Sequence, residues 1–179
     1  GTMGMDDRED DLDKFEPLNL YGWSKHKFDL LARDEGWLDR IAGLKYFNVY
    51  GPNESLDETH GNVIGIWQTK IKKGLPLPIV GDGNQRRDFT HVYDIVKGLI
   101  KIAFSKVSHI DGWELGTGMN YSVNELYDMF NQKFKTQSIN IPDQKGNYKL
   151  TLRENDDMIS KLGWHPEDRL KTHINSLKL

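Results

Sequence analysis

The chain of 179 residues contains no cysteine. Disulfides and thiolate metal sites are therefore excluded, and the absence is typical of a cytoplasmic protein. Apolar runs are short and interrupted by charged residues, so the sequence predicts no membrane-spanning segment and no membrane partner. The formal net charge is only -3, which gives no reason to expect a nucleic-acid partner. The six histidines are scattered without a spacing such as His-Glu-x-x-His, so we expect no metal site.

The order of patterns along the chain alternates between strand and helix, which indicates an α/β fold. An apolar run over 40–50, stopped by Gly51-Pro52, predicts a buried parallel strand. Ser122 and Glu125 form a capping-box pattern at the start of a helix over 123–134. Other predicted elements are helices over 20–35, 63–73, 92–104, 155–161 and 170–177, a proline-containing edge strand over 75–80, and strands over 113–115 and 139–141.

Tyr21 and Lys25 form a Tyr-x-x-x-Lys pattern on the first of these helices. Residues four apart share one face of a helix. A free phenol has a pKa near ~10, and a nearby ammonium favours the phenolate, so such a tyrosine could exchange a proton with a carbinol at neutral pH. Seven tyrosines in a lysine-rich chain also allow the pattern to arise by chance. The pair by itself therefore leaves catalysis open.

The sequence has no glycine-rich loop of the kind that binds a dinucleotide. Such a loop should lie well upstream of the tyrosine. Only twenty residues precede Tyr21, and Gly1 and Gly4 are their only glycines. We therefore expect the chain to be the C-terminal part of a larger enzyme, and we expect it to show no dinucleotide-dependent activity by itself.

Five segments resemble, in the same order, the extended short-chain dehydrogenase/reductase family, and in particular its NAD-dependent nucleotide-sugar epimerases and dehydratases. They read PLNLYGWSK (17–25), FNVYGP (47–52), GDGNQRRDFTHV (81–92), LGTG (115–118) and LGWHP (162–166). The resemblance covers nearly the whole chain. It implies the C-terminal part of an extended Rossmann-type dehydrogenase with its small α/β substrate-binding lobe, the N-terminal dinucleotide-binding half being missing.

The resemblance also implies roles for matching residues. Tyr21 would be the catalytic acid/base. Lys25 would favour its phenolate form and hydrogen-bond the nicotinamide ribose of NAD or NADP. The backbone around Phe47 and Val49 would lie beside the nicotinamide. The helix that carries Tyr21 would pack against its mate in a homodimer.

The implied substrate is a nucleotide-diphosphate sugar. Asn48 would reach its diphosphate, Arg87 would pair with a phosphate, as guanidinium geometry suits, and Tyr148 would touch substrate. Two alternatives stay open from the residues alone. Asn48 could cap the strand end, and Arg87 could form a structural ion pair with Asp88 or Asp94.

Within the family, residues 17–52 look most similar to the ADP-glycero-manno-heptose 6-epimerases, which would imply lipopolysaccharide biosynthesis. The opening Thr2-Met3-Gly4, an acidic loop over 6–13 and KGNY (145–148) point the same way. These epimerases place a catalytic lysine in the loop after Gly-Pro. That loop contains no lysine here, and an ungapped comparison puts Asp57 in its place. The turn GDG (81–83) is closer to UDP-sugar 4-epimerases and dehydratases.

Three functions follow from these observations. The first is an NAD(P)-dependent epimerase that oxidises the sugar transiently to a keto sugar. The others are a 4,6-dehydratase or reductase on the same scaffold, and a non-catalytic module for sugar-nucleotide binding or dimerisation. The expected division is a Rossmann remnant (1–52), a first part of the substrate lobe (53–90), a helix and strand returning to the Rossmann domain (91–118), and a second part of the substrate lobe (119–179).

Overall fold

The structure is a computed structural model that describes residues 17–106, 112–143 and 145–179. The acidic loop over 6–13 and the opening segment 2–4 lie outside the described residues. Within them, strands and helices alternate, so the predicted α/β class is confirmed.

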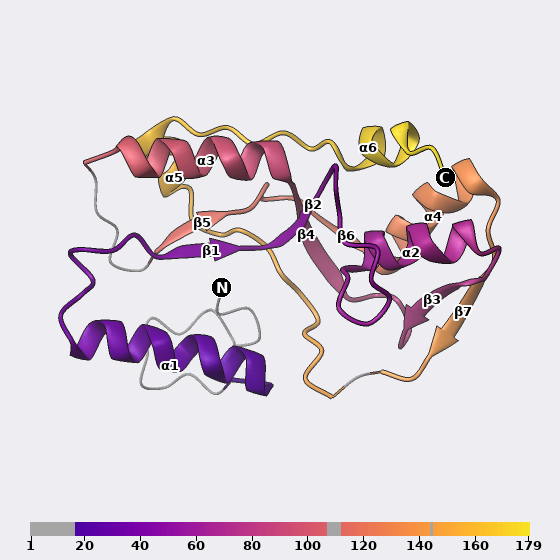
Figure 1. The fold of residues 1–179 in the computed structure, drawn as a ribbon, viewed down its shortest axis with the longest axis horizontal. Coiled ribbons are helices and arrows are strands. Elements are labelled where there is room, and N and C mark those ends of the chain that lie inside the picture. The colour runs from indigo at the N-terminus through magenta and orange to yellow at the C-terminus, as the bar shows by residue number, and fades with distance from the viewer. Residues whose placement is uncertain (1–16, 107–111, 144) are drawn as a thin grey trace.

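One half of the molecule is a layered arrangement around two parallel strands (Figure 1). Strand β1 (Leu44–Tyr46) pairs with β5 (Trp113–Leu115). Helices α1 (Leu20–Asp34) and α3 (Val92–Phe104) lie on opposite sides of these strands. The short helix α5 (Asp157–Leu162) packs against β5 and α3.

A three-stranded sheet connects this half to the other. Strand β2 (Asn48–Tyr50) is parallel to β4 (Arg86–His91), and β4 is antiparallel to β6 (Asn120–Ser122). Only Phe47, which is buried, separates β1 from β2, and the two strands belong to different sheets. The predicted parallel pairing is confirmed for both strands. The prediction of one continuous buried strand over 40–50 is wrong, because the chain changes sheets at Phe47 and the strand residues before it are only half-buried.

The other half of the molecule surrounds a two-stranded parallel sheet, β3 (Leu77–Val80) with β7 (Ser138–Ile141). The predicted edge position of β3 is confirmed, since a two-stranded sheet consists of edges. Helices α2 (Val63–Lys72), α4 (Val123–Phe134) and α6 (Leu170–Ser176) lie in this half (Figure 1). The capping box of α4 is present: Ser122 Oγ accepts from the Glu125 amide at 3.0 Å, and the Glu125 carboxylate accepts from the Ser122 amide at 2.7 Å.

Each half has its own hydrophobic cluster. The first cluster fills the space between α2, α4, α6 and the strands near them, and Trp67 meets Phe130 edge to face at 5.4 Å between ring centroids. The second lies between α3, β1, β5 and α5, around Trp113 and Trp164. Aromatic side chains of this size contribute much of the apolar area that folding removes from water.

Neither β4 nor β6 is among the strands predicted from the sequence. Strand β4 reads RRDFTH, so it lacks both an apolar run and a regular alternation of apolar and polar residues. It forms because it pairs on both sides, with β2 and with β6. Asp88 and Thr90 are buried in it, and they are tolerated there because they are hydrogen-bonded to each other and to other segments.

We expect Phe130→Ala to lower the free energy of unfolding by about 3–4 kcal/mol, because it leaves a cavity beside Trp67 in the first cluster. Phe104→Ala is the matched control, since that phenyl ring is 86% exposed and its removal should change stability by less than about 0.5 kcal/mol. Urea denaturation of the three proteins measures both values. Equal losses in the two variants would contradict the packing described here.

Candidate functional site

Helix α1 places Tyr21 and Lys25 on one face, as predicted. Asn19 caps the helix, and its side-chain oxygen accepts from the Gly22 amide at 2.8 Å. Lys25 Nζ lies 5.2 Å from the centroid of the Tyr21 ring. Tyr21 is 58% exposed and Lys25 is exposed as well, so a ligand can reach both groups.

Strand β2 carries the next group of predicted residues. Phe47 is buried, whereas Asn48 and Val49 are half-buried. The Val49 carbonyl oxygen accepts from Asn62 Nδ2 at 3.0 Å, which fixes the backbone at this point. Asn48 Oδ1 is buried and has no hydrogen-bond partner among the described residues. The alternative in which this oxygen caps the strand end is therefore not observed, and the oxygen is left as an acceptor for a donor group of a ligand.

Arg87 and Tyr148, which are far apart in the sequence, lie together. The guanidinium carbon of Arg87 is 5.4 Å from the centroid of the Tyr148 ring. Arg87 Nη2 donates to Asn147 Oδ1 at 2.7 Å, and Nη1 donates to the Arg86 carbonyl oxygen at 2.8 Å. Burial lowers the pKa of Arg87, because the charged guanidinium loses contact with water.

No described carboxylate forms an ion pair with Arg87. Asp94 pairs instead with Lys97 at 3.6 Å and with Arg169 at 3.5 Å. The structural ion pair considered from the sequence is therefore not observed. A half-buried cation held only by neutral groups can accept an anionic ligand with bidentate geometry.

The neighbouring Asp88 joins three segments around the site. Its carboxylate is fully buried and accepts from the amides of Thr117 at 2.8 Å, Gly118 at 2.9 Å and Arg153 at 3.1 Å. The hydroxyl of Thr117 also donates to it, at 2.7 Å. Sequence reasoning considered Asp88 only as a partner for Arg87. Nothing local in the sequence signals these contacts, because they join residues about 30 and 65 positions apart.

The loop after Gly51-Pro52 carries two carboxyl groups in different surroundings, Asp57 and Glu54. Glu54 was not singled out from the sequence. Asp57, which stands where the heptose epimerases have lysine, is exposed and accepts from the Thr59 amide at 2.7 Å. This hydrogen bond and those from His60 hold the pKa of Asp57 below its ordinary value. The same hydrogen bonds tie the Asp57 carboxylate to a local turn. Glu54 instead accepts from Asn62 and from Gln68 Nε2. Burial raises the pKa of Glu54 to about 7, a value suited to proton transfer.

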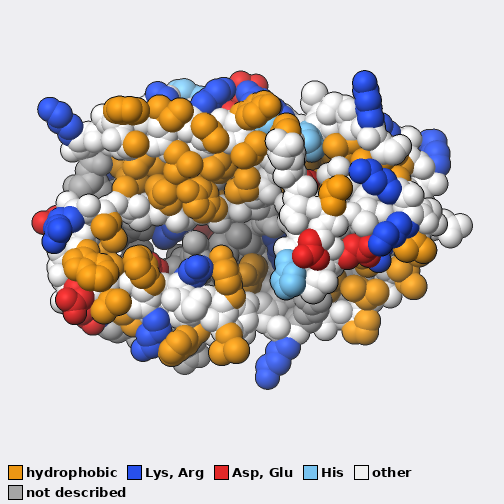
Figure 2. Space-filling model, viewed as in Figure 1, with side chains coloured by type: hydrophobic (Ala, Val, Ile, Leu, Met, Phe, Trp, Pro, Cys, Tyr) orange, Lys and Arg blue, Asp and Glu red, His pale blue; other side chains and the backbone are white. Residues whose placement is uncertain are grey.

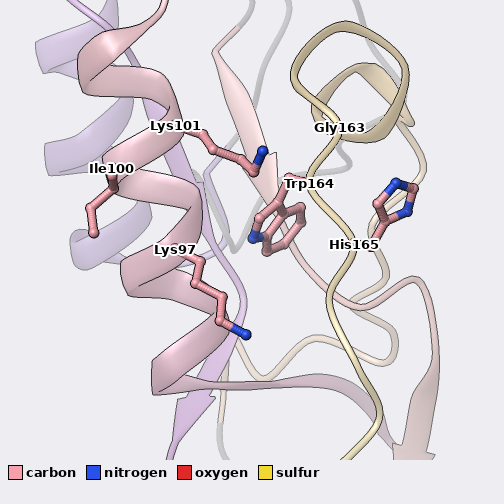
Figure 3. Close-up of a pocket in the computed structure, with 6 residues that line it drawn as sticks. All are labelled: Lys97, Ile100, Lys101, Gly163, Trp164 and His165. Atoms are coloured by element: carbon pink, nitrogen blue, oxygen red, sulfur yellow. The ribbon is translucent and has the colours of Figure 1, made fainter.

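A hollow of about 370 Å³ lies beside α3 (Figure 3). It is lined by Lys97, Ile100, Lys101, Gly163, Trp164 and His165. Lys101 Nζ donates to the Leu162 carbonyl oxygen at 3.0 Å, and Trp164 Nε1 donates to the Asp94 carbonyl oxygen at 2.8 Å. These polar groups already serve the packing of α3, and none of the lining residues belongs to the predicted site.

The described part of the chain contains neither a metal-binding cluster nor a membrane-spanning helix. No cluster of three or more His, Cys, Asp or Glu side chains could hold a metal ion there. Over the same ranges, no helix combines the length and apolar character that crossing a bilayer requires.

We expect Glu54 to make stability depend on pH. Its folded-state pKa is raised to about 7, so the stabilisation that its neutral form provides is complete below its unfolded pKa and is lost as the pH rises through about 7. Relative to Glu54→Gln, the wild type should lose about 1–3 kcal/mol of unfolding free energy between about pH 5 and pH 8. Urea denaturation across this range measures the loss. Glu35→Gln, at an exposed position, is the control and should follow the wild type; a Glu54→Gln difference that is constant with pH would contradict the raised pKa.

We expect Asp88→Asn to lower the unfolding free energy by about 2–4 kcal/mol, because an amide group cannot accept all the hydrogen bonds that the buried carboxylate accepts. Thermal or urea denaturation measures the change. Asp128→Asn, on the exposed side of α4, is the matched control and should be neutral. A neutral Asp88→Asn would show that the three segments are held together by other contacts.

Comparison with known proteins identifies the family. Residues 1–112 match the family described as NAD dependent epimerase/dehydratase. The ADP-L-glycero-D-manno-heptose-6-epimerase of Nitratidesulfovibrio vulgaris is 42% identical over 104 residues, which cover 54% of this chain and 32% of that protein. A Methanocaldococcus jannaschii protein, provisionally named as a UDP-glucose 4-epimerase, is 33% identical over 170 residues, which cover 92% of this chain and 54% of that protein.

A solved structure is similar over the same region. The UDP-glucose 4-epimerase of Thermotoga maritima with UDP-glucose has a TM-score of 0.77 and 26% identity, covering 89% of this chain and 52% of that one. The chain thus spans about half or less of the length of these relatives. The family match covers more than half of this chain. The chain belongs to the NAD-dependent epimerase/dehydratase family.

Proposed function

We propose that the chain contributes the catalytic helix and the sugar-nucleotide-binding lobe of an NAD-dependent nucleotide-sugar epimerase. The observation that carries this proposal is Arg87, a half-buried guanidinium without a carboxylate partner among the described residues, with Tyr148 beside it. Arginine and an aromatic ring together suit a ligand that carries both phosphate and a flat base. The names of the epimerase relatives support the same class of substrate.

The substrate-binding residues in this proposal are Asn48, Arg87 and Tyr148. Arg87 would form charge-assisted hydrogen bonds with a phosphate, and these are stronger than neutral ones. Asn48 Oδ1 has no hydrogen-bond partner in the part of the chain that the structure describes, so a donor group of the ligand would satisfy it. The sugar is not specified by these contacts, and the loop residue Asp57 takes no part because it is committed to its turn.

The proposal also assigns residues to the nicotinamide end of the cofactor. Lys25 would hydrogen-bond the nicotinamide ribose, and the backbone of Phe47 and Val49 would border the ring. The exposed ammonium of Lys25 and the Val49 backbone, fixed by Asn62, fit this role. NAD, when bound there, would supply reversible hydride transfer with the sugar.

Tyr21 performs the proton transfers in this mechanism. Its phenolate oxygen removes the proton of the sugar hydroxyl as that carbon is oxidised to a ketone. It returns the proton to the sugar oxygen as the same carbon is reduced on its opposite face, and this reduction inverts the configuration and leaves no net oxidation. The Lys25 ammonium, 5.2 Å from the ring centroid, stabilises the Tyr21 phenolate before the first transfer and after the second; between them Tyr21 is a neutral phenol.

Helix α1 exposes apolar side chains that a second copy of the chain could cover. Leu20, Trp23, Phe28 and Leu31 on this helix are all 46% exposed or more. Figure 2 shows hydrophobic side chains gathered on the half of the visible face that holds α1 and α3. An exposed apolar surface of this kind marks a contact with another protein surface, and we propose homodimerisation through α1.

We also propose the division into a Rossmann remnant and a substrate lobe. The two hydrophobic clusters support it, since Leu44, Trp113 and Leu115 pack in one and Trp67 and Phe130 in the other. One stretch crosses this division. Residues of α5 and the segment after it pack with the Rossmann-side cluster, although they come late in the chain.

We expect Arg87→Met to weaken UDP-glucose binding by about 10–100-fold, the loss that corresponds to removing a hydrogen bond to a charged group. Isothermal titration of the chain with UDP-glucose and with UDP measures it, and both ligands should lose affinity equally because the contact is with phosphate. Arg40→Met, at an exposed arginine, is the control and should bind as the wild type does. Unchanged affinity in Arg87→Met would refute the phosphate role.

A further inference from the structure

The side chain of Asn19 makes two hydrogen bonds in opposite directions. Its oxygen caps α1 through the Gly22 amide at 2.8 Å. Its nitrogen donates to the Gly146 carbonyl oxygen at 3.2 Å, although the two residues are 127 positions apart. Asn19 is half-buried and lies two residues before Tyr21. A single amide group therefore connects the start of the catalytic helix to a distant loop.

The same loop, residues 146–148, also contacts the Arg87 side chain. Gly146 has φ +82°, and a Cβ atom on it would lie 2.8 Å from the Leu18 carbonyl oxygen, so only glycine allows the loop to approach the start of α1 this closely. The next residue, Asn147, accepts from Arg87 Nη2 at 2.7 Å. Tyr148 then places its ring beside the guanidinium. Three consecutive residues thus reach from the catalytic helix to the proposed phosphate site.

We propose that Asn19 is a positioning residue that sets the place of Tyr21 relative to the diphosphate of the bound nucleotide sugar, acting through the loop 146–148. The inference rests on the proposed function for the identity of the ligand. Its physical basis is that proton transfer requires the phenol oxygen and the sugar hydroxyl to meet within hydrogen-bond distance, while Arg87 and Tyr148 hold the other end of the same molecule. Asn19 links the helix that carries Tyr21 to the loop that carries Tyr148.

Three variants separate this role from simple helix capping. Asp and Ser cap a helix about as well as Asn, but neither offers the side-chain N–H that Gly146 accepts. Asn19→Asp and Asn19→Ser should therefore keep α1 capped while breaking the link. Asn19→Ala should lose both.

The first measurement is hydrogen exchange without ligand. In the Asp and Ser variants, the Arg86 amide, which donates to the carbonyl oxygen of Lys149 directly after this loop at 2.8 Å, should exchange at least about threefold faster than in the wild type, because an opening that costs less free energy exposes it more often. The amide of Trp23, in the first turn of α1, should change only in Asn19→Ala. Unchanged exchange at Arg86 in the Asp and Ser variants overturns the link, whether or not a nucleotide binds.

The second measurement is UDP-glucose affinity by isothermal titration. Loss of one neutral hydrogen bond that orders the loop should weaken binding about fivefold, which corresponds to about 1 kcal/mol, in both Asn19→Asp and Asn19→Ser. A cap without a positioning role predicts no change in either. Affinities within twofold of the wild type overturn the positioning role. If the wild-type chain does not bind UDP-glucose or UDP at all, the proposed substrate class fails, and the positioning of Tyr21 toward a diphosphate fails with it even where the exchange experiment shows the link.

Discussion

The buried carboxylate of Asp88 is the interaction on which the arrangement of the site depends. It accepts backbone amides from the turn after β5 and from the segment at Arg153, and both are brought to β4 by these hydrogen bonds. A buried charge without such partners would be too costly to keep, so the three segments must stay together for the carboxylate to remain buried. The Asp88 amide also donates to the Thr151 hydroxyl, which ties the last part of the chain to the same strand.

Arg87 and Asp88 are neighbours of opposite charge that do not pair. Consecutive side chains of a strand point to opposite faces of the sheet. Asp88 is therefore satisfied by amides on one face, while Arg87 meets Asn147 and Tyr148 on the other. The strand geometry keeps the guanidinium available to an outside anion, which an ion pair between the two residues would prevent. This separation leaves Asp88 to hold the surrounding segments together and Arg87 free of a carboxylate from its own strand neighbour, as the proposed phosphate role requires.

In the proposed function, the two halves of the molecule contribute different groups of residues. The half around β1 and β5 carries α1 with Tyr21 and Lys25, and the half around β3 and β7 carries the loop with Tyr148. Two features link these halves. Strand β4 carries Arg87, and the Asn19 side chain donates to the Gly146 carbonyl oxygen of the loop. The solved epimerase of Thermotoga maritima, a chain of about twice the length, shares the fold over the matching region, as the TM-score of 0.77 indicates. The chain thus contains both the proposed proton-transfer pair and a candidate phosphate site.

Local patterns in the sequence were enough to predict the α/β class, the face that Tyr21 and Lys25 share, the capping box at Ser122 and the edge position of β3. Helical periodicity, capping and proline effects act over a few residues, so they can be read from neighbouring positions. Only the tertiary structure decided that β4 is a strand, that burial raises the pKa of Glu54, and that Asn19 bonds Gly146. Each of these depends on contacts between residues distant in the sequence, and no local pattern of residue types specifies which distant groups will meet.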